Sequence, residues 1–515
     1  MPGQPIDLGP FVGGINNATD DSTIEDTDLI EAINWLVGID GTLIGRPPFY
    51  EWDDDNPVTD KRLKLLGYTT LHASSAFTPV LIASNEDGTW AYYSGAWDKI
   101  SDNEYDTFVT YGETNNRVHI AATTSEQGGD WVIADGAISE YSDMPIGWTS
   151  AVHKDRIWIA GNLAEPSRLY YSMATPQGNN GDWDIAGPTA PAGTIDINPG
   201  DGQRINYILS YEDNLVIFKD DSTWILAYDG VISRGQLVAV SNSIGATDKH
   251  AVTLYDGVAY VYHEGNIYAF SQNQFQSITD KFTPDGDSAV ASSYSEPLSL
   301  SVFGDNLVLR QYDKVYVYHF LTGAWTEWQT EFPVGEFVLV PTNIGIGGSE
   351  YIVASADLDT IELFKINTTW NDVATEDFEC SILTKTYDFG TDRNFKRLFW
   401  WGIDCEASSG DVTAEVTPIN NDFILRWDDL TGLWSDYETR TWDTLMSSQP
   451  SIEDGPTSSS SNKRRFYKCL KALRFHQIKF RVTITSDGTE SSGRVKLFAI
   501  VPFVGIKQGV VAKIT

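Results

Sequence analysis

The sequence predicts an all-β protein: a β-propeller of about seven blades followed by a C-terminal β-sandwich domain. Three observations predict this fold. The chain has 17 Trp, 24 Tyr and 23 Phe, and aromatic side chains favour half-buried strands. Turn formers occur throughout, with 43 Gly and 21 Pro. Over the first two-thirds of the chain, an apolar strand, an acidic or glycine turn and an aromatic strand recur in that order.

The repeat has the length of a propeller blade. Successive markers of the aromatic strand are separated by 41, 38, 55, 43, 48 and 46 residues, and a four-stranded blade takes about 40–50 residues. A β-solenoid would repeat at about half that length. Seven markers indicate seven blades, with six or eight as alternatives; the markers are Trp90, Trp131, Leu169, Trp224, Ile267, Val315 and Ile361.

The pattern divides the chain into three consecutive parts: an N-terminal segment with an extended arm (1–58), the propeller (59–375) and a sandwich or jelly-roll-like domain (376–515). Within the propeller, the long separation coincides with a Pro/Gly/Asn-rich stretch, 175–202, which we interpret as an insertion loop. After the blades, longer alternating runs predict strands of a sandwich at 378–386, 397–403, 411–418, 478–485 and 495–501.

One helix is expected near the N-terminus. Asp28 and Glu31 have the spacing of a capping box, and Leu29, Ile33 and Leu36 would share one helical face. We therefore expect a short helix over 29–35, ended by Gly38.

The net charge of −37 is unevenly distributed. Residues 379–515 contain 18 Lys plus Arg against 17 Asp plus Glu, whereas residues 1–378 contain 17 against 55. Affinity for nucleic acid comes mainly from basic side chains that neutralise phosphates, so the propeller part is expected to repel a polyanion. Acidity that serves solubility alone is the alternative.

No catalytic, metal or cofactor site is predicted, and we expect the chain not to be an enzyme. The seven His form no HxH or HExxH pattern, and there is no nucleophile elbow, Walker loop or dinucleotide fingerprint. The acidic stretches 53–56 and 196–202 could surround Ca²⁺, but they lack a calcium-loop register and are more simply turns. Cys380, Cys405 and Cys469 form no CxxC pair and are interpreted as free thiols in strands.

The sequence contains no run of about 18 apolar residues that would span a bilayer, and its acidic N-terminus is unlike a signal peptide. We therefore expect no membrane insertion, and assembly in the cytoplasm of the host cell.

The basic residues concentrate near the C-terminus, after a serine-rich stretch (447–461) that predicts a flexible loop. Lys463, Arg464 and Arg465 begin this concentration, and they are candidates for contact with an acidic neighbouring subunit. Contact with DNA, or a plain solvated loop, are the alternatives.

The N-terminal segment resembles a known family. Val12-Gly13-Gly14-Ile15, Asn34, Gly41-Thr-Leu43 and Arg46-Pro47-Pro48 are similar to the opening of the tail nozzle proteins of short-tailed phages, known as tail tubular protein B. Two glycines permit a sharp bend, and two prolines favour an extended chain. Gly13, Gly14, Asn34, Arg46, Pro47 and Pro48 are therefore candidate interface residues, together with the basic group 463–465.

Further stretches resemble phage tail-hub and packaged-DNA stabilisation proteins, among them 205–226, 243–245, 257–270 and 323–328. The start of the C-terminal β domain of several tail proteins is similar to residues 384–390 followed by Lys396-Arg397. The resemblance implies a virion component that forms a ring homo-oligomer, a hexamer, around the DNA exit path. It implies an adaptor or tail tube protein and tail fibres as partners, and phage DNA passing through the lumen without specific binding.

Two alternatives stay open. One is a minor tail tip protein of a long-tailed phage. The other is a carbohydrate-binding receptor adhesin, for which exposed Trp side chains around one propeller mouth would be expected.

Overall fold

The structure is a computed structural model, and it describes residues 4–47, 49–51, 63–73, 76–112, 116–123, 128–141, 144–185, 191–282, 298–311, 314–330, 334–340, 350–355, 363–367, 379–389, 396–407, 412–419, 452–453, 463–486 and 495–506. The chain divides into two compact units. The propeller unit comprises residues 49–315 and 330–368. The sandwich unit comprises residues 1–48, 316–329 and 369–515. Each unit therefore contains segments far apart in the sequence, unlike the three consecutive parts that the sequence suggested.

The described residues confirm the all-β propeller prediction. Five four-stranded antiparallel sheets follow one another along the chain, each with its strands in chain order. The first blade contains β7 (Leu65–Ala73), β8 (Ala76–Asn85), β9 (Gly88–Tyr93) and β10 (Ala96–Ser101), and the second contains β11 (Thr107–Tyr111), β12 (Arg117–Ala121), β13 (Gly129–Trp131) and β14 (Ser139–Glu140). The third contains β15 (Thr149–His153), β16 (Arg156–Ala160), β17 (Arg168–Tyr171) and β18 (Gly193–Asp196), and the fourth contains β19 (Ile205–Tyr211), β20 (Asn214–Lys219), β21 (Thr223–Ala227) and β22 (Gln236–Ser241). The fifth contains β23 (Val252–Tyr255), β24 (Val258–His263), β25 (Asn266–Ser271) and β26 (Gln274–Ser277).

Two further groups of four strands complete seven blades. The strands β27 (Leu298–Phe303), β28 (Asn306–Gln311), β29 (Lys314–His319) and β30 (Ala324–Trp328) are neighbours in chain order, and the division between the units falls within β29. The last blade consists of β31 (Val334–Val340), β32 (Glu350–Ser355), β33 (Leu363–Asn367) and β6 (Phe49–Glu51). β6 pairs antiparallel with β33, so a segment from the N-terminal part of the chain closes the final blade.

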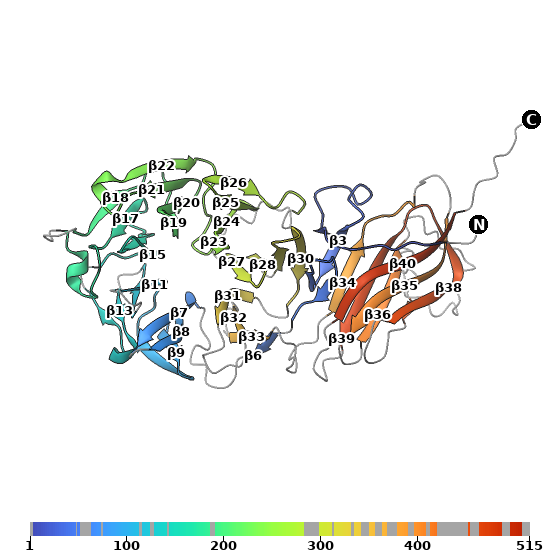
Figure 1. The fold of residues 1–515 in the computed structure, drawn as a ribbon, viewed down its shortest axis with the longest axis horizontal. Helices are drawn as coiled ribbons and strands as arrows, with labels where there is room; N and C mark the ends of the chain where they lie inside the picture. The colour runs from blue at the N-terminus through green and yellow to red at the C-terminus, as the bar shows by residue number, and fades with distance from the viewer. Residues whose placement is uncertain are drawn as a thin grey trace, which may run out of the picture. The chain divides into compact units, whose positions relative to one another are not determined.

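The blades form a closed ring. The first strand of each blade lies nearest the common centre, from β7 round to β31 (Figure 1). β31 contacts β7, which joins the last blade to the first. Neighbouring blades thus pack against one another around the ring, which is how a repeat fold buries a continuous core.

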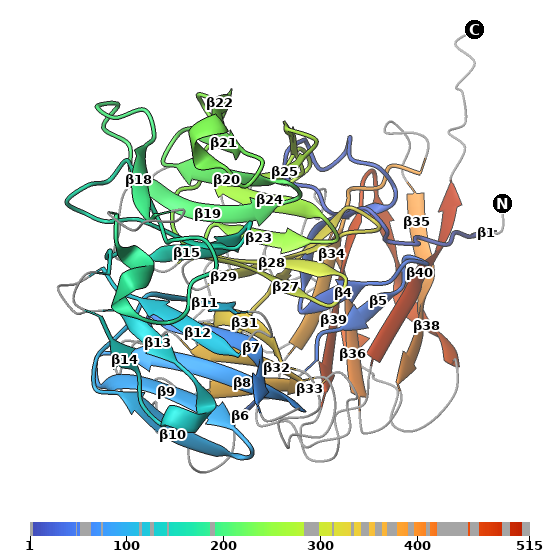
Figure 2. The ribbon, with the colours of Figure 1, turned by 60° about the vertical axis from the view of Figure 1, so that its left-hand side comes forward.

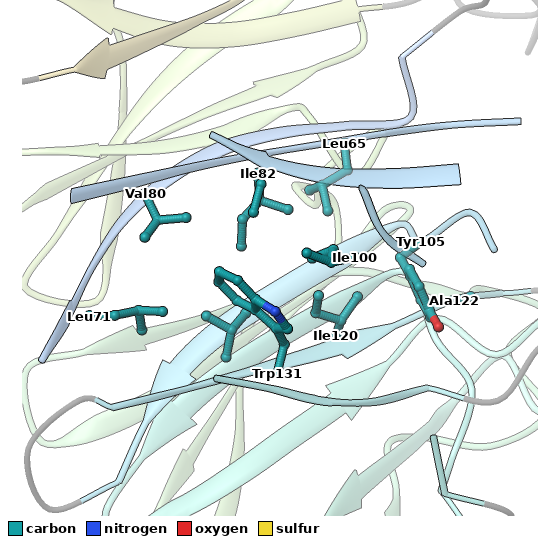
Figure 3. Packing of buried hydrophobic residues seen from close by; sticks show 11 residues of the cluster. Leu65, Leu71, Val80, Ile82, Ile100, Tyr105, Ile120, Ala122 and Trp131 are labelled. Carbon is teal, nitrogen blue, oxygen red and sulfur yellow. The ribbon is translucent and has the colours of Figure 1, made fainter. Parts of the chain in front are cut away.

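The core between blades is aromatic and aliphatic. Between the first two blades, Trp131 is fully buried and contacts a cluster of apolar side chains from both sheets (Figure 3). The cluster includes Leu65, Leu71, Val80, Ile82, Ile100, Tyr105, Ile120 and Ala122.

The sandwich unit has two sheets. One has the strand order β38-β35-β40-β5-β4, with β1 beside β40 (Figure 2). The other contains β30-β2-β3-β34-β39-β36-β37. The strands not yet given are β1 (Gln4–Pro5), β2 (Gly14–Ile15), β3 (Asp28–Ile33), β4 (Trp35–Val37), β5 (Leu43–Gly45), β34 (Glu379–Thr384), β35 (Lys396–Ala407), β36 (Val412–Ile419), β37 (Ile452–Glu453), β38 (Lys463–Phe475), β39 (Lys479–Ser486) and β40 (Val495–Ile506).

The expected N-terminal helix is wrong. Residues 28–33 form β3, which pairs parallel with β2 and antiparallel with β34. The Asp28 carboxylate does not cap a helix: it is buried and accepts a hydrogen bond from Asn16 Nδ2 at 2.7 Å. Long-range strand pairing overrode the local helical pattern. The helices among the described residues are three short 3₁₀ turns, η1 (Ile133–Asp135), η2 (Asn180–Trp183) and η3 (Ile232–Arg234).

Two loop expectations also need correction. The stretch 175–202, expected to be an insertion, contains η2 and β18, the fourth strand of its blade. The basic residues 463–465 begin β38, a 13-residue strand, rather than a solvated loop. The linker 447–461 lies outside the described residues except for β37. In the described part of the chain, no helix is long and apolar enough to cross a membrane.

Candidate functional site

The N-terminal motif residues meet inside the sandwich unit, where Asn34 is the central side chain. Asn34 lies between β3 and β4 with a φ of 62°, a left-handed conformation that Asn tolerates better than most residues. Its Oδ1 accepts hydrogen bonds from Arg46 Nε at 3.0 Å and from the Gln329 amide at 2.9 Å. Its Nδ2 donates to the Glu379 carbonyl at 2.7 Å. One side chain therefore joins three segments that are distant in the sequence.

Arg46 completes this buried node. Its side chain has no solvent exposure, and its guanidinium also donates to the carbonyls of Pro47 and Gln329, both at 3.2 Å. A buried guanidinium is costly unless its donors are satisfied, so these bonds explain why the chain around Arg46 adopts one arrangement. We call Asn34, Arg46, Gln329 and Glu379 the N-terminal node.

Gly13 and Gly14 allow close approach beside the node. A Cβ at Gly13 would lie 1.8 Å from Asp28 Oδ1. Gly14 has a φ of +64°, and a Cβ there would lie 2.6 Å from the backbone N and O of Trp325. Both positions therefore need glycine for steric reasons, whereas the sequence suggested glycine for a sharp bend.

These placements refine the candidate interface. The side chains of Asn34, Arg46 and Pro47 are buried, so they hold the local chain path and do not themselves present an outer surface of the unit. Pro48 lies outside the described residues. Whether this region contacts another subunit stays a prediction.

The basic candidates lie in the sandwich unit. Lys463, Arg464 and Arg465 are paired through the backbone with Cys405, Asp404 and Ile403 of β35. They occupy the N-terminal end of β38, and their contact with a neighbour also stays a prediction.

The acidic excess is largest in the propeller unit but is not confined to it. The propeller unit contains 16 Lys plus Arg against 43 Asp plus Glu, a net charge of −27, and the sandwich unit contains 19 against 29, a net charge of −10. The difference from the sequence-based division arises mainly because residues 1–48, with one basic and eight acidic side chains, belong to the sandwich unit.

An ion network lies at the end of the propeller ring where the innermost strands begin. Lys249, before β23 of the fifth blade, donates to Asp106 Oδ1 at 3.1 Å and to the Lys64 carbonyl at 3.3 Å. Asp106 precedes β11 and Lys64 precedes β7, so Lys249 reaches the second and first blades. Lys64 also pairs with Glu104. We call Lys64, Glu104, Asp106 and Lys249 the axial network.

Hydroxyl side chains link the innermost strands themselves. Thr69 is hydrogen-bonded to Thr110, and Thr107 Oγ1 to Ser150 Oγ at 2.8 Å. His153 Nδ1 and Ser210 Oγ are 2.8 Å apart between the third and fourth blades. Short polar contacts between neighbouring blades therefore run around this part of the ring.

The acidic loop 196–202 binds a basic side chain of the protein itself. Lys219 has no solvent exposure, and its ammonium donates to both carboxylate oxygens of Asp201 at 2.7 Å and to the Ile197 carbonyl at 3.0 Å. The neighbouring Asp196 pairs with Arg168 at 2.8 Å. The carboxylates considered for Ca²⁺ in this loop are thus engaged by basic side chains. The other acidic stretch, 53–56, lies outside the described residues.

Among the described residues, one group of side chains could hold a metal ion: Asp221, His263 and Glu264, whose ligand atoms all lie within 4.8 Å of one another. The thiol of Cys380 offers no reactive group, because burial raises its pKa to about 12, and a thiol needs its thiolate form to attack or to bind a metal.

Comparisons with known proteins assign no function to this chain. No family model and no curated protein matches the chain. Among solved structures, it is similar to the extracellular domain of the one component system BT4673 from B. thetaiotaomicron, with a TM-score of 0.42 and 12% identity over 62% of this chain and 40% of that one. It is also similar to BBS1N in complex with ARL6DN, with a TM-score of 0.42 and 11% identity over 63% of this chain and 98% of that one. The chain spans less than half the length of the BT4673 domain.

Proposed function

We propose that this chain is a structural subunit of a bacteriophage tail: a nozzle or hub protein that forms a ring around the DNA exit channel. In that position it would guide or gate genome ejection and anchor tail fibres. The observation that carries the proposal is the N-terminal motif. Gly13, Gly14, Asn34 and Arg46, which resemble the opening of the nozzle family, are used together at one place, where each has a steric or hydrogen-bonding reason.

The charge distribution gives the proposal a mechanism. A propeller unit with a net charge of −27 opposes binding of the DNA phosphate backbone, because that binding depends on basic side chains. A ring of such subunits would present DNA with a wall to which it does not adhere. Passage of DNA through the ring would then not depend on the base sequence of the DNA.

The path of DNA in this proposal runs between subunits and not through the axis of one propeller. Lys249 of the fifth blade reaches Asp106 and Lys64 across the start of the innermost strands. The lumen must therefore be formed by the ring of subunits. An adaptor or tail tube protein and tail fibres would bind the outer ends of that ring.

The adhesin alternative has less support. A sugar-binding mouth would present exposed Trp faces, but each tryptophan whose side chain is described is buried or half-buried. These are Trp35, Trp90, Trp97, Trp131, Trp148, Trp158, Trp183, Trp224, Trp325 and Trp328. Their role is to pack the blades and the sandwich.

The proposal is tested with the purified full-length chain by light scattering and negative-stain electron microscopy. We expect rings of identical subunits, and we expect the ring fraction to rise between low and moderate salt, because salt screens the repulsion between acidic subunits. A fluorescent DNA duplex should show no binding to the rings at low salt. A chain that stays monomeric across protein and salt concentrations, or that binds the duplex tightly, would contradict the proposal.

A further inference from the structure

Two turns of neighbouring blades bring an imidazole and two carboxylates together. Asp221 lies in the turn between β20 and β21 of the fourth blade. His263 ends β24 of the fifth blade, and Glu264 follows it in the turn to β25. One ligand atom from each of the three side chains lies within 4.8 Å of the others.

The backbone fixes the two turns side by side. The connection from the fourth to the fifth blade runs between them, and its residues bind both strands. The Ala246 amide donates to the Lys219 carbonyl at 2.8 Å, and the Thr247 amide donates to the Tyr262 carbonyl at 3.3 Å. Asp221 lies two residues after Lys219, and His263 follows Tyr262 directly. Hydrogen-bonded backbone therefore holds the two turns of the cluster in place.

His263 supplies the observation that points to a ligand. Its side chain is 95% buried, since its exposed fraction is 5%, and its Nδ1 has no hydrogen-bond partner among the described residues. Buried polar atoms are nearly always hydrogen-bonded, and leaving one unpaired costs free energy. A buried imidazole with a nitrogen that lacks a hydrogen bond, in a side chain that lies beside two carboxylates, is arranged like a metal ligand.

The two carboxylates are also free to bind. In the described part of the chain, neither Asp221 nor Glu264 forms an ion pair, and both are exposed. The adjacent Asp220 differs, because its carboxylate accepts hydrogen bonds from the Arg204 amide at 2.7 Å and from Asn206 Nδ2 at 2.9 Å. Asp221 is therefore the available member of the acidic pair, and its charge beside Glu264 is unfavourable without a cation.

From this geometry we propose that Asp221, His263 and Glu264 form a Zn²⁺ site that joins the fourth blade to the fifth. An imidazole nitrogen with two carboxylate oxygens suits Zn²⁺, whereas Ca²⁺ and Mg²⁺ take oxygen ligands. A tetrahedral ion with bonds of about 2.0–2.2 Å holds its ligands roughly 3.4 Å apart. The ligand atoms, which lie within 4.8 Å of one another, would have to move closer when the ion binds, and the two carboxylate side chains that would move are exposed. Water takes the fourth position.

The experiment uses the full-length chain, stripped with a chelator and dialysed, and adds Zn²⁺ alone. Calorimetric titration should give one Zn²⁺ per chain, and thermal unfolding should move to a higher temperature when Zn²⁺ is added. Asp221→Asn and Glu264→Gln should each weaken Zn²⁺ binding at least about tenfold, because even the outer neighbours of metal ligands cost 10–100-fold in affinity. The double variant should bind no Zn²⁺ and show no thermal shift.

A matched control separates this site from adventitious binding. Asp256→Asn changes another exposed acidic turn residue at the opposite end of β24, and it should bind Zn²⁺ as the unaltered chain does. Because the two carboxylate positions are exposed, their variants fold even if His263→Ala does not. Failure of the unaltered chain to bind Zn²⁺, or equal binding in the Asp221→Asn/Glu264→Gln double variant, would overturn the proposal. Neither result bears on ring formation.

Discussion

The two units of this protein reach stability by different routes. In the propeller unit, each sheet is built from consecutive strands, apart from the last blade, which β6 completes, and the core lies between neighbouring blades. In the sandwich unit, strands of residues 1–48 pair with strands about 300 or more residues later, and the N-terminal node joins Asn34 to Gln329 and Glu379. A change in a blade should therefore disturb one blade and its neighbours, whereas a change in the node should loosen segments from three parts of the chain.

The largest expected effect comes from Arg46→Ala. Removing a fully buried guanidinium leaves Asn34 Oδ1 and the carbonyls of Pro47 and Gln329 without this donor. We expect a loss of about 3 kcal/mol or more in the free energy of unfolding of the sandwich unit. Hydrogen exchange measured by mass spectrometry should speed up in β3 and β34 together and change little in β20.

Arg234→Ala is the control for that prediction. The Arg234 side chain is 72% exposed and lies 3.5 Å from Asp229, and surface ion pairs of this kind contribute at most about 1 kcal/mol. Equal destabilisation by the two arginine variants would mean that the node does not hold the unit together.

The corresponding change in the propeller unit is Lys219→Met. It removes the ammonium that pairs with Asp201 and leaves a partly buried carboxylate without its cation. We expect a loss of about 3 kcal/mol, with faster hydrogen exchange confined to the third and fourth blades. Adding Asp201→Asn should restore part of the loss, because it removes the unpaired charge. If the double variant is less stable than Lys219→Met by the full cost of Asp201→Asn alone, the two residues are not coupled.

A third pair of variants compares two glycines with positive φ. Gly14→Ala in the sandwich unit would place a methyl group 2.6 Å from the Trp325 backbone, whereas Gly95→Ala, at a φ of +86° between β9 and β10, meets no atom within 4 Å. The left-handed conformation costs a non-glycine residue roughly 1–2 kcal/mol. Gly95→Ala should show only that cost in chemical denaturation, and Gly14→Ala about 1–3 kcal/mol more from the clash. Similar values for both would show that the chain at Gly14 shifts without strain.

The same contrast explains how much could be predicted from the sequence. Blade periodicity is local: the markers Trp90, Trp131, Leu169, Trp224, Ile267 and Val315 all lie on the third strand of their blades, in β9, β13, β17, β21, β25 and β29, and Ile361 lies outside the described residues. The runs chosen in the C-terminal part also coincide with β34, β35, β36, β39 and β40. In both regions, alternation within a few residues carries the information.

What could not be predicted depends on distant partners. Leu29, Ile33 and Leu36 fit a helical face, and only pairing of β3 with β34 makes them strand residues. The strand β38 was missed because a serine-rich stretch precedes it and basic residues begin it. Asp221 and His263 are 42 residues apart, about one blade repeat, so an alignment of blade against blade would have brought these turn residues together. Motif searches that compare residues only a few positions apart would not bring them together.

The smallest expected effect concerns the axial network and acid pH. Burial by itself would raise the pKa of Asp106, but the Lys249 ammonium and the hydrogen bonds from Thr123 outweigh it and hold this pKa below 3.8. A carboxyl group whose pKa is depressed by folding stabilises the folded state above its unfolded pKa, and this contribution is lost as the pH falls through the folded value. The network should therefore contribute fully above about pH 5, begin to lose its effect near pH 4 and lose the rest as the pH falls through the lower folded pKa.

Lys249→Met isolates this contribution. With the ammonium removed, burial raises the pKa of Asp106, so the acid loss of stability should begin at a higher pH than in the unaltered chain. We expect a difference of about 1 kcal/mol near neutral pH. The measurement is the unfolding temperature from pH 3 to pH 7, with Asp106→Asn as the control that cannot titrate. Because Lys249 joins blades that are not neighbours, a larger effect than that of Lys219→Met would show that contacts across the ring, and not those between adjacent blades, stabilise the propeller most.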